Sequence, residues 1–85
     1  MSSGIMHVEY HDSFGSNEFC KFIGDKFEAV EDKADHYYLE YNELIAAFDR
    51  MSAEFKNDKF NQECCDKMLD IIRKNGDAAE FCIGW

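Results

Sequence analysis

Clusters of basic residues and long apolar runs are both missing from this 85-residue sequence, and each absence excludes a class of function. Nine lysines and arginines stand against 18 aspartates and glutamates, which gives a formal net charge of −9. Binding to a phosphate backbone needs clustered Lys and Arg, so we expect no direct nucleic-acid contact. No apolar run is long enough for a signal peptide or a membrane span, so we expect a cytoplasmic protein without membrane contact.

Motifs that carry catalytic chemistry are also missing. The cysteines include no Cys-x-x-Cys pair, which excludes a zinc ribbon and a thioredoxin-like site. There is no glycine-rich phosphate loop, no Ser-centred elbow and no calcium loop. We therefore expect neither enzyme activity nor a cofactor. In a cytoplasmic chain we also expect free thiols at Cys20, Cys64, Cys65 and Cys82.

The residues that are present are those of a folded chain. Apolar residues make up 46% of the sequence and aromatic residues 15%. This is enough to build a packed core, whereas disordered chains have low hydrophobicity. At 85 residues the chain is just above the size at which one hydrophobic core becomes marginal, so we expect a single domain over 1–85.

Local patterns predict an α+β fold in which two or three amphipathic helices pack on a small sheet of N- and C-terminal strands. Residues 6–11 alternate between apolar and polar, which is the period of a half-buried strand. Residues 12–17 have a turn composition, and Ser16 is a suitable helix N-cap. The predicted elements are a loose tail over 1–4, a strand over 6–11, helices over 17–34, 36–56 and 58–75, and a strand over 80–85.

Apolar residues follow a helical period from Phe19 to Phe55 and form one stripe, within roughly 40° at 100° per residue. The phase continues through Asp35, so the pattern also allows one long helix, about 60 Å in length, in an essentially all-α fold. Such a helix needs a partner chain, whereas a break with Asp35 as N-cap gives a compact monomer. Monomer and homodimer both stay open. The apolar stripe consists of Phe19, Ile23, Val30, Tyr37, Tyr41, Phe48 and Phe55.

The last helix has clearer ends. If it continued from Phe55, its apolar face would be rotated by roughly 140°, so we expect a turn near Asn57 with Asp58 as a suitable cap. Asn75-Gly76 is a strong helix stop that places Gly76 in a left-handed conformation. Alternating residues beyond it predict the C-terminal strand. The expected apolar face is made of Phe60, Cys64, Met68, Ile71 and Ile72.

Three side chains of the N-terminal strand form a candidate metal site. His7, Glu9 and His11 share one strand face, and two imidazoles with a carboxylate are a ligand set that zinc accepts. The spacing is not that of the zincin helix, and a polar outer face of an edge strand has the same pattern without a metal. We assign no metal, and a small metal-dependent enzyme ranks third among the functions considered.

Negative charge is concentrated in the middle of the chain. Residues 25–54 hold nine acids and three bases, a net charge of −6, whereas residues 55–74 have a net charge of +1. Three glutamates lie opposite the apolar stripe on the expected second helix and form an acidic row about four turns long. Such rows occur on ordinary solvated helices, and also on proteins that imitate nucleic-acid phosphates. The candidate partner-binding residues are Glu40, Glu43 and Glu54 of this row, with Asp32, Asp49 and the off-stripe Tyr38.

In size, acidity and lack of motifs the chain resembles two groups of small inhibitors. One is the phage proteins that block nucleic-acid-handling defence enzymes, of the anti-CRISPR type, and the other is the immunity proteins of cationic nuclease toxins. The resemblance is one of character, because no stretch of residues matches a family motif. It implies an inhibitor or regulator that occupies the cationic surface of a basic partner, a nuclease or a nucleoprotein complex. The alternative is a structural or assembly subunit that associates through the apolar stripe.

Overall fold

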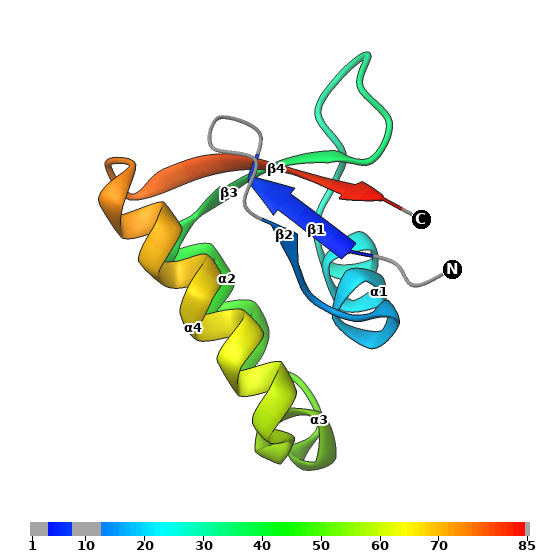
Figure 1. Ribbon diagram of the computed structural model, residues 1–85, viewed down its shortest axis with the longest axis vertical. Helices are drawn as coiled ribbons and strands as arrows, with labels where there is room; N and C mark the ends of the chain where they lie inside the picture. The colour runs from blue at the N-terminus through cyan, green and yellow to red at the C-terminus, as the bar shows by residue number, and fades with distance from the viewer. Residues whose placement is uncertain (1–3, 8–12, 85) are drawn as a thin grey trace. The chain divides into compact units, whose positions relative to one another are not determined.

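The computed structural model describes residues 4–7 and 13–84, and within them it confirms the α+β class (Figure 1). No helix of this described part is long and apolar enough to cross a membrane. The elements are β1 (Gly4–His7), β2 (Ser13–Phe14), α1 (Asn17–Lys26), β3 (His36–Glu40), α2 (Tyr41–Asp49), α3 (Ala53–Asn57), α4 (Lys59–Lys74) and β4 (Ala78–Gly84).

The strands of the described residues form one sheet in the order β2-β1-β4-β3. β1 pairs with β4 in antiparallel fashion, so the predicted pairing of N- and C-terminal strands is confirmed (Figure 1). Gly4, expected in the loose tail, is the first residue of β1 and pairs with Gly84. The rest of the expected tail, residues 8–11 of the expected first strand and the final Trp85 lie outside the described residues.

The chain divides into two compact units: unit 1 is Met1–Tyr38 with Glu80–Trp85, and unit 2 is Leu39–Ala79. In unit 1, α1 packs against β1. Phe19 and Phe22 meet edge to face, with ring centroids 5.5 Å apart, and Phe14 meets Phe81 in the same way at 6.4 Å. Among the described residues of this unit, the fully buried side chains are Ile5, Phe19, Cys20, Ile23 and Phe81.

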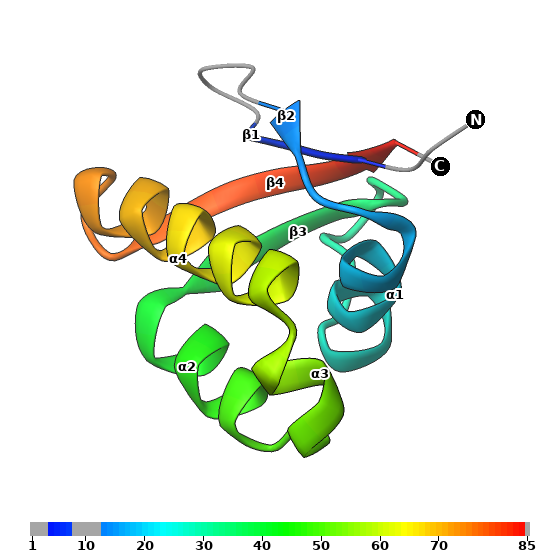
Figure 2. The ribbon, with the colours of Figure 1, turned by 60° about the horizontal axis from the view of Figure 1, so that its bottom comes forward.

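Unit 2 is a helical unit in which α2 and α3 both pack against α4 (Figure 2). Phe48 of α2 and Phe55 of α3 meet edge to face at 6.1 Å. Asn61 is almost completely buried, and its side-chain amide donates to the Phe55 carbonyl oxygen over 3.2 Å. A buried polar group that is hydrogen-bonded in this way avoids the cost of desolvation without a partner.

The start of α1 and both ends of α4 follow the local sequence. The predicted caps Ser16 and Asp58 are confirmed: their side-chain oxygens accept from the Phe19 and Asn61 N–H groups at 3.2 and 3.0 Å. Each such cap stabilises its helix by about 1 kcal/mol. The predicted helix stop is also confirmed, because α4 ends at Lys74 and Gly76 has a φ of 83°.

Two of the expected helices are wrong in their bounds. The helix expected over 17–34 ends at Lys26. The segment that follows is mostly polar, and its two large apolar residues, Phe27 and Val30, are too few to form an apolar helix face. The helix expected over 36–56 begins as strand β3 and is then divided into α2 and α3, so the single long helix of the all-α alternative does not form. In β3, Tyr37 and Leu39 are buried and the residues between and after them are exposed, which is the period of a strand.

The apolar stripe is therefore not one surface. Its residues are distributed over α1, the segment after it, β3, α2 and α3, and four of the seven are buried: Phe19, Ile23, Tyr37 and Phe55. The expected face of α4 is only partly confirmed. Cys64, Met68 and Ile72 are buried, but Phe60 is 44% exposed and Ile71 is half-buried. Asn61 and Cys65 are buried in addition.

Candidate partner-binding surface

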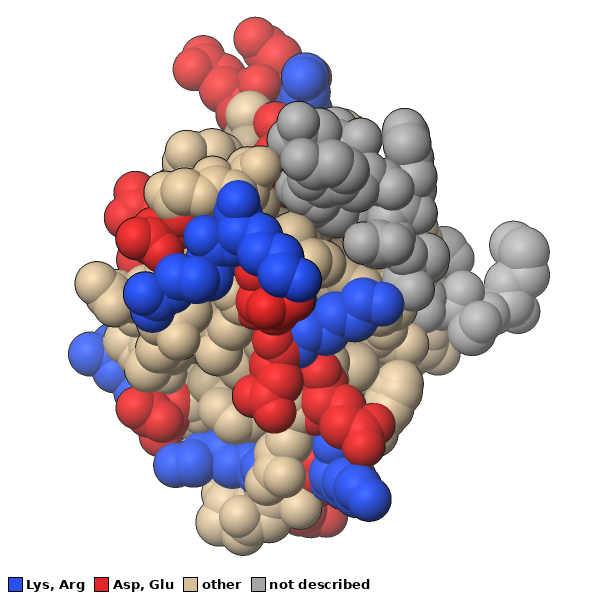
Figure 3. Space-filling model, turned by 60° about the vertical axis from the view of Figure 1, so that its left-hand side comes forward, with Lys and Arg blue, Asp and Glu red and all other residues tan. Residues whose placement is uncertain are grey.

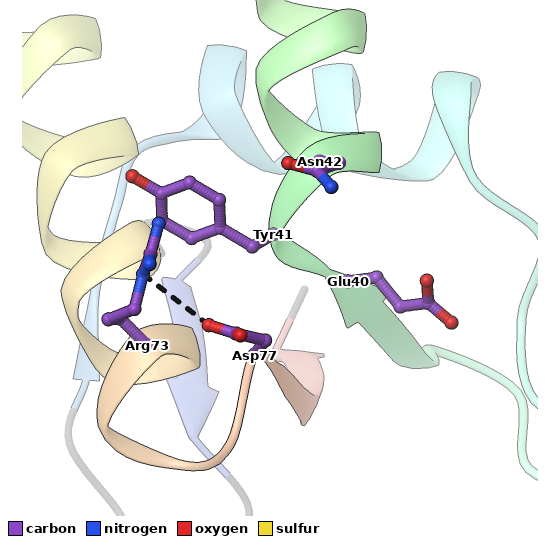
Figure 4. Close-up of a pocket in the computed structure, with 5 residues that line it drawn as sticks. All are labelled: Glu40, Tyr41, Asn42, Arg73 and Asp77. Carbon is purple, nitrogen blue, oxygen red and sulfur yellow. Dashed lines mark ion pairs between the residues drawn. The ribbon is translucent and has the colours of Figure 1, made fainter.

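The start of α2 and the end of α4 border a polar hollow of about 230 Å³ (Figure 4). The Tyr41 N–H donates to the Asp77 carbonyl oxygen at 3.1 Å, and the Arg73 guanidinium lies 3.8 Å from the Tyr41 ring centroid. Arg73 Nε is also 3.4 Å from an Asp77 carboxylate oxygen. Glu40 and Asn42 complete the lining. Arg73, the basic residue of this hollow, therefore already has partners within the chain, the Tyr41 ring and the Asp77 carboxylate.

Four of the predicted partner-binding carboxylates lie in unit 2, and all are exposed. Glu40 is the N-cap residue of α2, Glu43 is in its first turn, Asp49 is its last residue and Glu54 is in α3. None of them forms an ion pair with a base in the described part of the chain. The prediction of one row on a single rigid helix is wrong, because α2 ends at Asp49 and α3 starts behind its own cap, Ser52. We call these four residues the helical carboxylates.

Asp32, the fifth predicted carboxylate, lies in unit 1 on a loop of residues 27–35, which we call the acidic loop. The loop connects α1 to β3 and extends away from the strands (Figure 1), and its end is fixed by backbone hydrogen bonds. The Val30 N–H donates to the His36 carbonyl oxygen at 2.7 Å. Asp32 and Asp35 both have positive φ, near 65°, a conformation that Asp tolerates better than most residues. The acidic loop has a net charge of −3 over nine residues, from Glu28, Glu31, Asp32 and Asp35 with Lys33.

The surface of α4 differs from both acidic surfaces because its charges are balanced. The helix has four bases and three acids, a net charge of +1. Lys74 Nζ lies 2.9 Å from Asp70 in an i,i+4 pair. On the side of the molecule that carries α4, basic and acidic side chains are interspersed (Figure 3). Exposed pairs of this kind contribute little to stability, and they leave little net field for a charged partner.

Tyr38 is 59% exposed and is thus the most exposed large apolar side chain of the described residues. The sequence predicts its exposure from its place off a helical stripe, but the reason is different: it alternates with buried Tyr37 and Leu39 on β3. Nearby on the same strand, His36 Nδ1 lies 2.8 Å from Glu80 Oε2 of β4. Sequence patterns give no signal for this pair, because its members are 44 residues apart.

All four cysteines are free thiols, as the sequence predicts. Cys64 is buried as expected, but so are Cys20 and Cys65. Burial is the main reason that the pKa of the Cys65 thiol is raised to about 12, with negative charge at Asp66 adding to it. Burial also raises the pKa of half-buried Cys82, with a further contribution from Glu80. These environments favour the unreactive thiol over the nucleophilic thiolate.

The candidate metal ligands cannot be placed together. Glu9 and His11 lie outside the described residues, and His7 is the last residue of β1, where its register partner is Phe81. Among the residues that the structure does describe, no group of three His, Cys, Asp or Glu side chains is arranged to hold a metal ion.

Comparison with protein-family models, with curated proteins and with solved structures gives no significant match.

Proposed function

We propose that this chain is a small acidic binding protein that inhibits or regulates a basic, nucleic-acid-handling partner by occupying its cationic surface. The observation that carries the proposal is the separation of charge on the described surface. The helical carboxylates and the acidic loop have unbalanced negative charge, whereas α4 is balanced.

The physical basis is electrostatic complementarity. Exposed carboxylates attract a cationic groove, raise the encounter rate and pair with the Arg and Lys that normally hold phosphates. Each exposed pair is worth less than about 1 kcal/mol, so the carboxylates have to act as a set. The proposal therefore concerns Glu40, Glu43, Asp49 and Glu54 together, with Asp32 on the acidic loop.

The test is charge reversal on two surfaces. Glu40→Lys, Glu43→Lys and Glu54→Lys are combined in one variant, and Glu63→Lys, Asp66→Lys and Asp70→Lys of α4 in a matched control with the same change in net charge. All six side chains are exposed. Each tagged protein is used to capture partners from cells of the source organism, and bound material is eluted with a salt gradient.

We expect the native protein and the α4 control to retain the same partner, a nuclease or nucleoprotein released by moderate salt. The variant with Glu40, Glu43 and Glu54 reversed should lose it, with affinity reduced by at least tenfold when the isolated partner is titrated. Circular dichroism confirms that both variants fold. Equal retention by all three proteins would overturn the assignment of the helical carboxylates, and a partner without a basic surface would overturn the proposed function.

A further inference from the structure

In unit 1 the sheet has one face toward α1 and an opposite face that presents side chains of β3 and β4. On β4, buried Phe81 and Ile83 alternate with half-buried Glu80 and Cys82. α1 packs against β1 on the buried side (Figure 2). We call the side chains of the opposite face, His36, Tyr38, Glu80 and Cys82, the outer sheet face.

The outer sheet face has two features that are typical of contact surfaces. Tyr38 exposes 59% of its area, more than Phe60, which at 44% is the other exposed large apolar residue of the described chain. Tyrosine is a frequent anchor of interfaces because it offers a large rigid ring at low entropic cost. Beside it, the 2.8 Å contact of His36 with Glu80 joins β3 to β4 and fixes both side chains before any partner arrives.

The charge around this face selects the sign of the partner. Residues 1–38 and 80–85 hold nine acids and three bases, a net charge of −6 for unit 1. The acidic loop leads directly into β3, and its Val30 N–H donates a hydrogen bond to the His36 carbonyl oxygen. A cation that approaches the Tyr38 ring therefore meets both the negative face of the ring and the field of the neighbouring carboxylates.

The chain already contains this combination of groups in unit 2. There the Arg73 guanidinium lies 3.8 Å from the Tyr41 ring centroid while its Nε is 3.4 Å from Asp77. Arginine suits such a position better than lysine, because its planar guanidinium stacks on a ring and still donates to a carboxylate. Tyr38 is 59% exposed, whereas Tyr41 is half-buried, and Tyr38 lies in an acidic unit whose sequence has no arginine.

We infer that the outer sheet face is the docking surface for an arginine-bearing segment of the basic partner, with Tyr38 as the ring on which the guanidinium stacks. This inference rests on the proposed function and names the chemistry that its partner must offer.

The test uses defined peptides in place of the unidentified partner. A blocked nine-residue peptide with three arginines among glycine and serine is compared with its lysine and citrulline counterparts. Each is titrated into the full-length, ¹⁵N-labelled protein at low salt, and amide shifts and affinities are measured. We expect the largest shifts at His36, Tyr38, Glu80 and Cys82, and tighter binding of the arginine peptide.

Variants of the ring separate stacking from charge. Tyr38→Phe should keep the preference for arginine over lysine, whereas Tyr38→Leu should weaken the arginine peptide about two- to fivefold and abolish the preference, as expected for an exposed cation–π contact. Phe60→Leu in unit 2 is the matched control and should change nothing. Because Tyr38 and Phe60 are exposed, none of these changes should affect folding.

Three results would overturn the inference. Equal binding of the arginine and lysine peptides, unaffected by Tyr38→Leu, would mean attraction by charge alone, and the proposed function would stand without this surface. Shifts at the same residues that grow with protein concentration before peptide is added would identify a second copy as the occupant. Absence of peptide binding at low salt would also overturn it, while charge reversal still tests the proposed function independently.

Discussion

At the scale of single residues, burial decides chemistry that the sequence leaves open. Cys64 and Cys65 are neighbours whose side chains diverge by about 100° on a helix, and only Cys64 belongs to the predicted apolar face. Both are buried, because α4 is covered by α2 and α3 over a wider arc than one stripe. The pKa of the Cys65 thiol is consequently raised from 9.0 to about 12, chiefly by desolvation.

This shift predicts a dependence of stability on alkaline pH. The folded state keeps the Cys65 proton up to about pH 12, whereas the unfolded chain loses it near pH 9. Between these values the unfolded state binds fewer protons, so stability is complete below pH 9 and falls as pH rises. The native protein should lose unfolding free energy between pH 8 and pH 10. Without the Cys65 thiol, this loss should be smaller by about 1 kcal/mol. Urea titrations of the native protein and Cys65→Ala at both pH values measure it, and parallel losses would contradict the pKa.

At the scale of elements, the end of α4 depends on the conformation of one glycine. Gly76 has a φ of 83°, and the next N–H, that of Asp77, donates to the Ile72 carbonyl oxygen at 2.9 Å. This bond closes the helix in the manner of a Schellman motif. An added Cβ at Gly76 would meet no atom within 4 Å in the described part of the chain, so any cost of a side chain is conformational and not steric.

We therefore expect Gly76→Ala to destabilise the protein by about 1 kcal/mol and Gly76→Val by somewhat more, because left-handed φ is disfavoured for residues with a Cβ. Gly84→Ala is the matched control. Gly84 has no positive φ, and a Cβ there would lie 3.9 Å from the Gly4 carbonyl oxygen, an ordinary contact. Thermal unfolding followed by circular dichroism compares the three. A melting temperature unchanged by Gly76→Val would show that the helix end is misassigned.

The same elements show which parts of the fold can be predicted from the sequence. Caps and stops such as Ser16, Asp58 and Gly76 are local, so their residues predict them correctly. β3 is not local: its residues also fit a helical period, and its strand state depends on β4, about 40 residues away. The candidate surface is only partly predictable for the same reason. The sequence correctly predicts that Glu40 and Tyr38 are exposed, but the helix over 36–56 on which it places both does not exist.

At the scale of the whole molecule, a net charge of −9 on 85 residues affects stability and binding in opposite directions. Like charges on a compact chain repel one another and destabilise the folded state. The same charges attract a basic partner, so they favour binding. Salt screens both interactions, because the Debye length falls from about 30 Å at 0.01 M to about 10 Å at 0.1 M.

We therefore expect the melting temperature to rise and partner affinity to fall between 10 and 200 mM NaCl. If screening removes about 1 kcal/mol of repulsion, the melting temperature should rise by roughly 4–8 °C. Glu28→Gln, Glu31→Gln and Asp32→Asn together bring the net charge from −9 to −6 and should reduce this response. Neutralising Glu63, Asp66 and Asp70 changes the net charge equally, but next to the bases of α4, and should reduce it less. Equal responses would mean that total charge, and not its concentration in the acidic loop, governs stability.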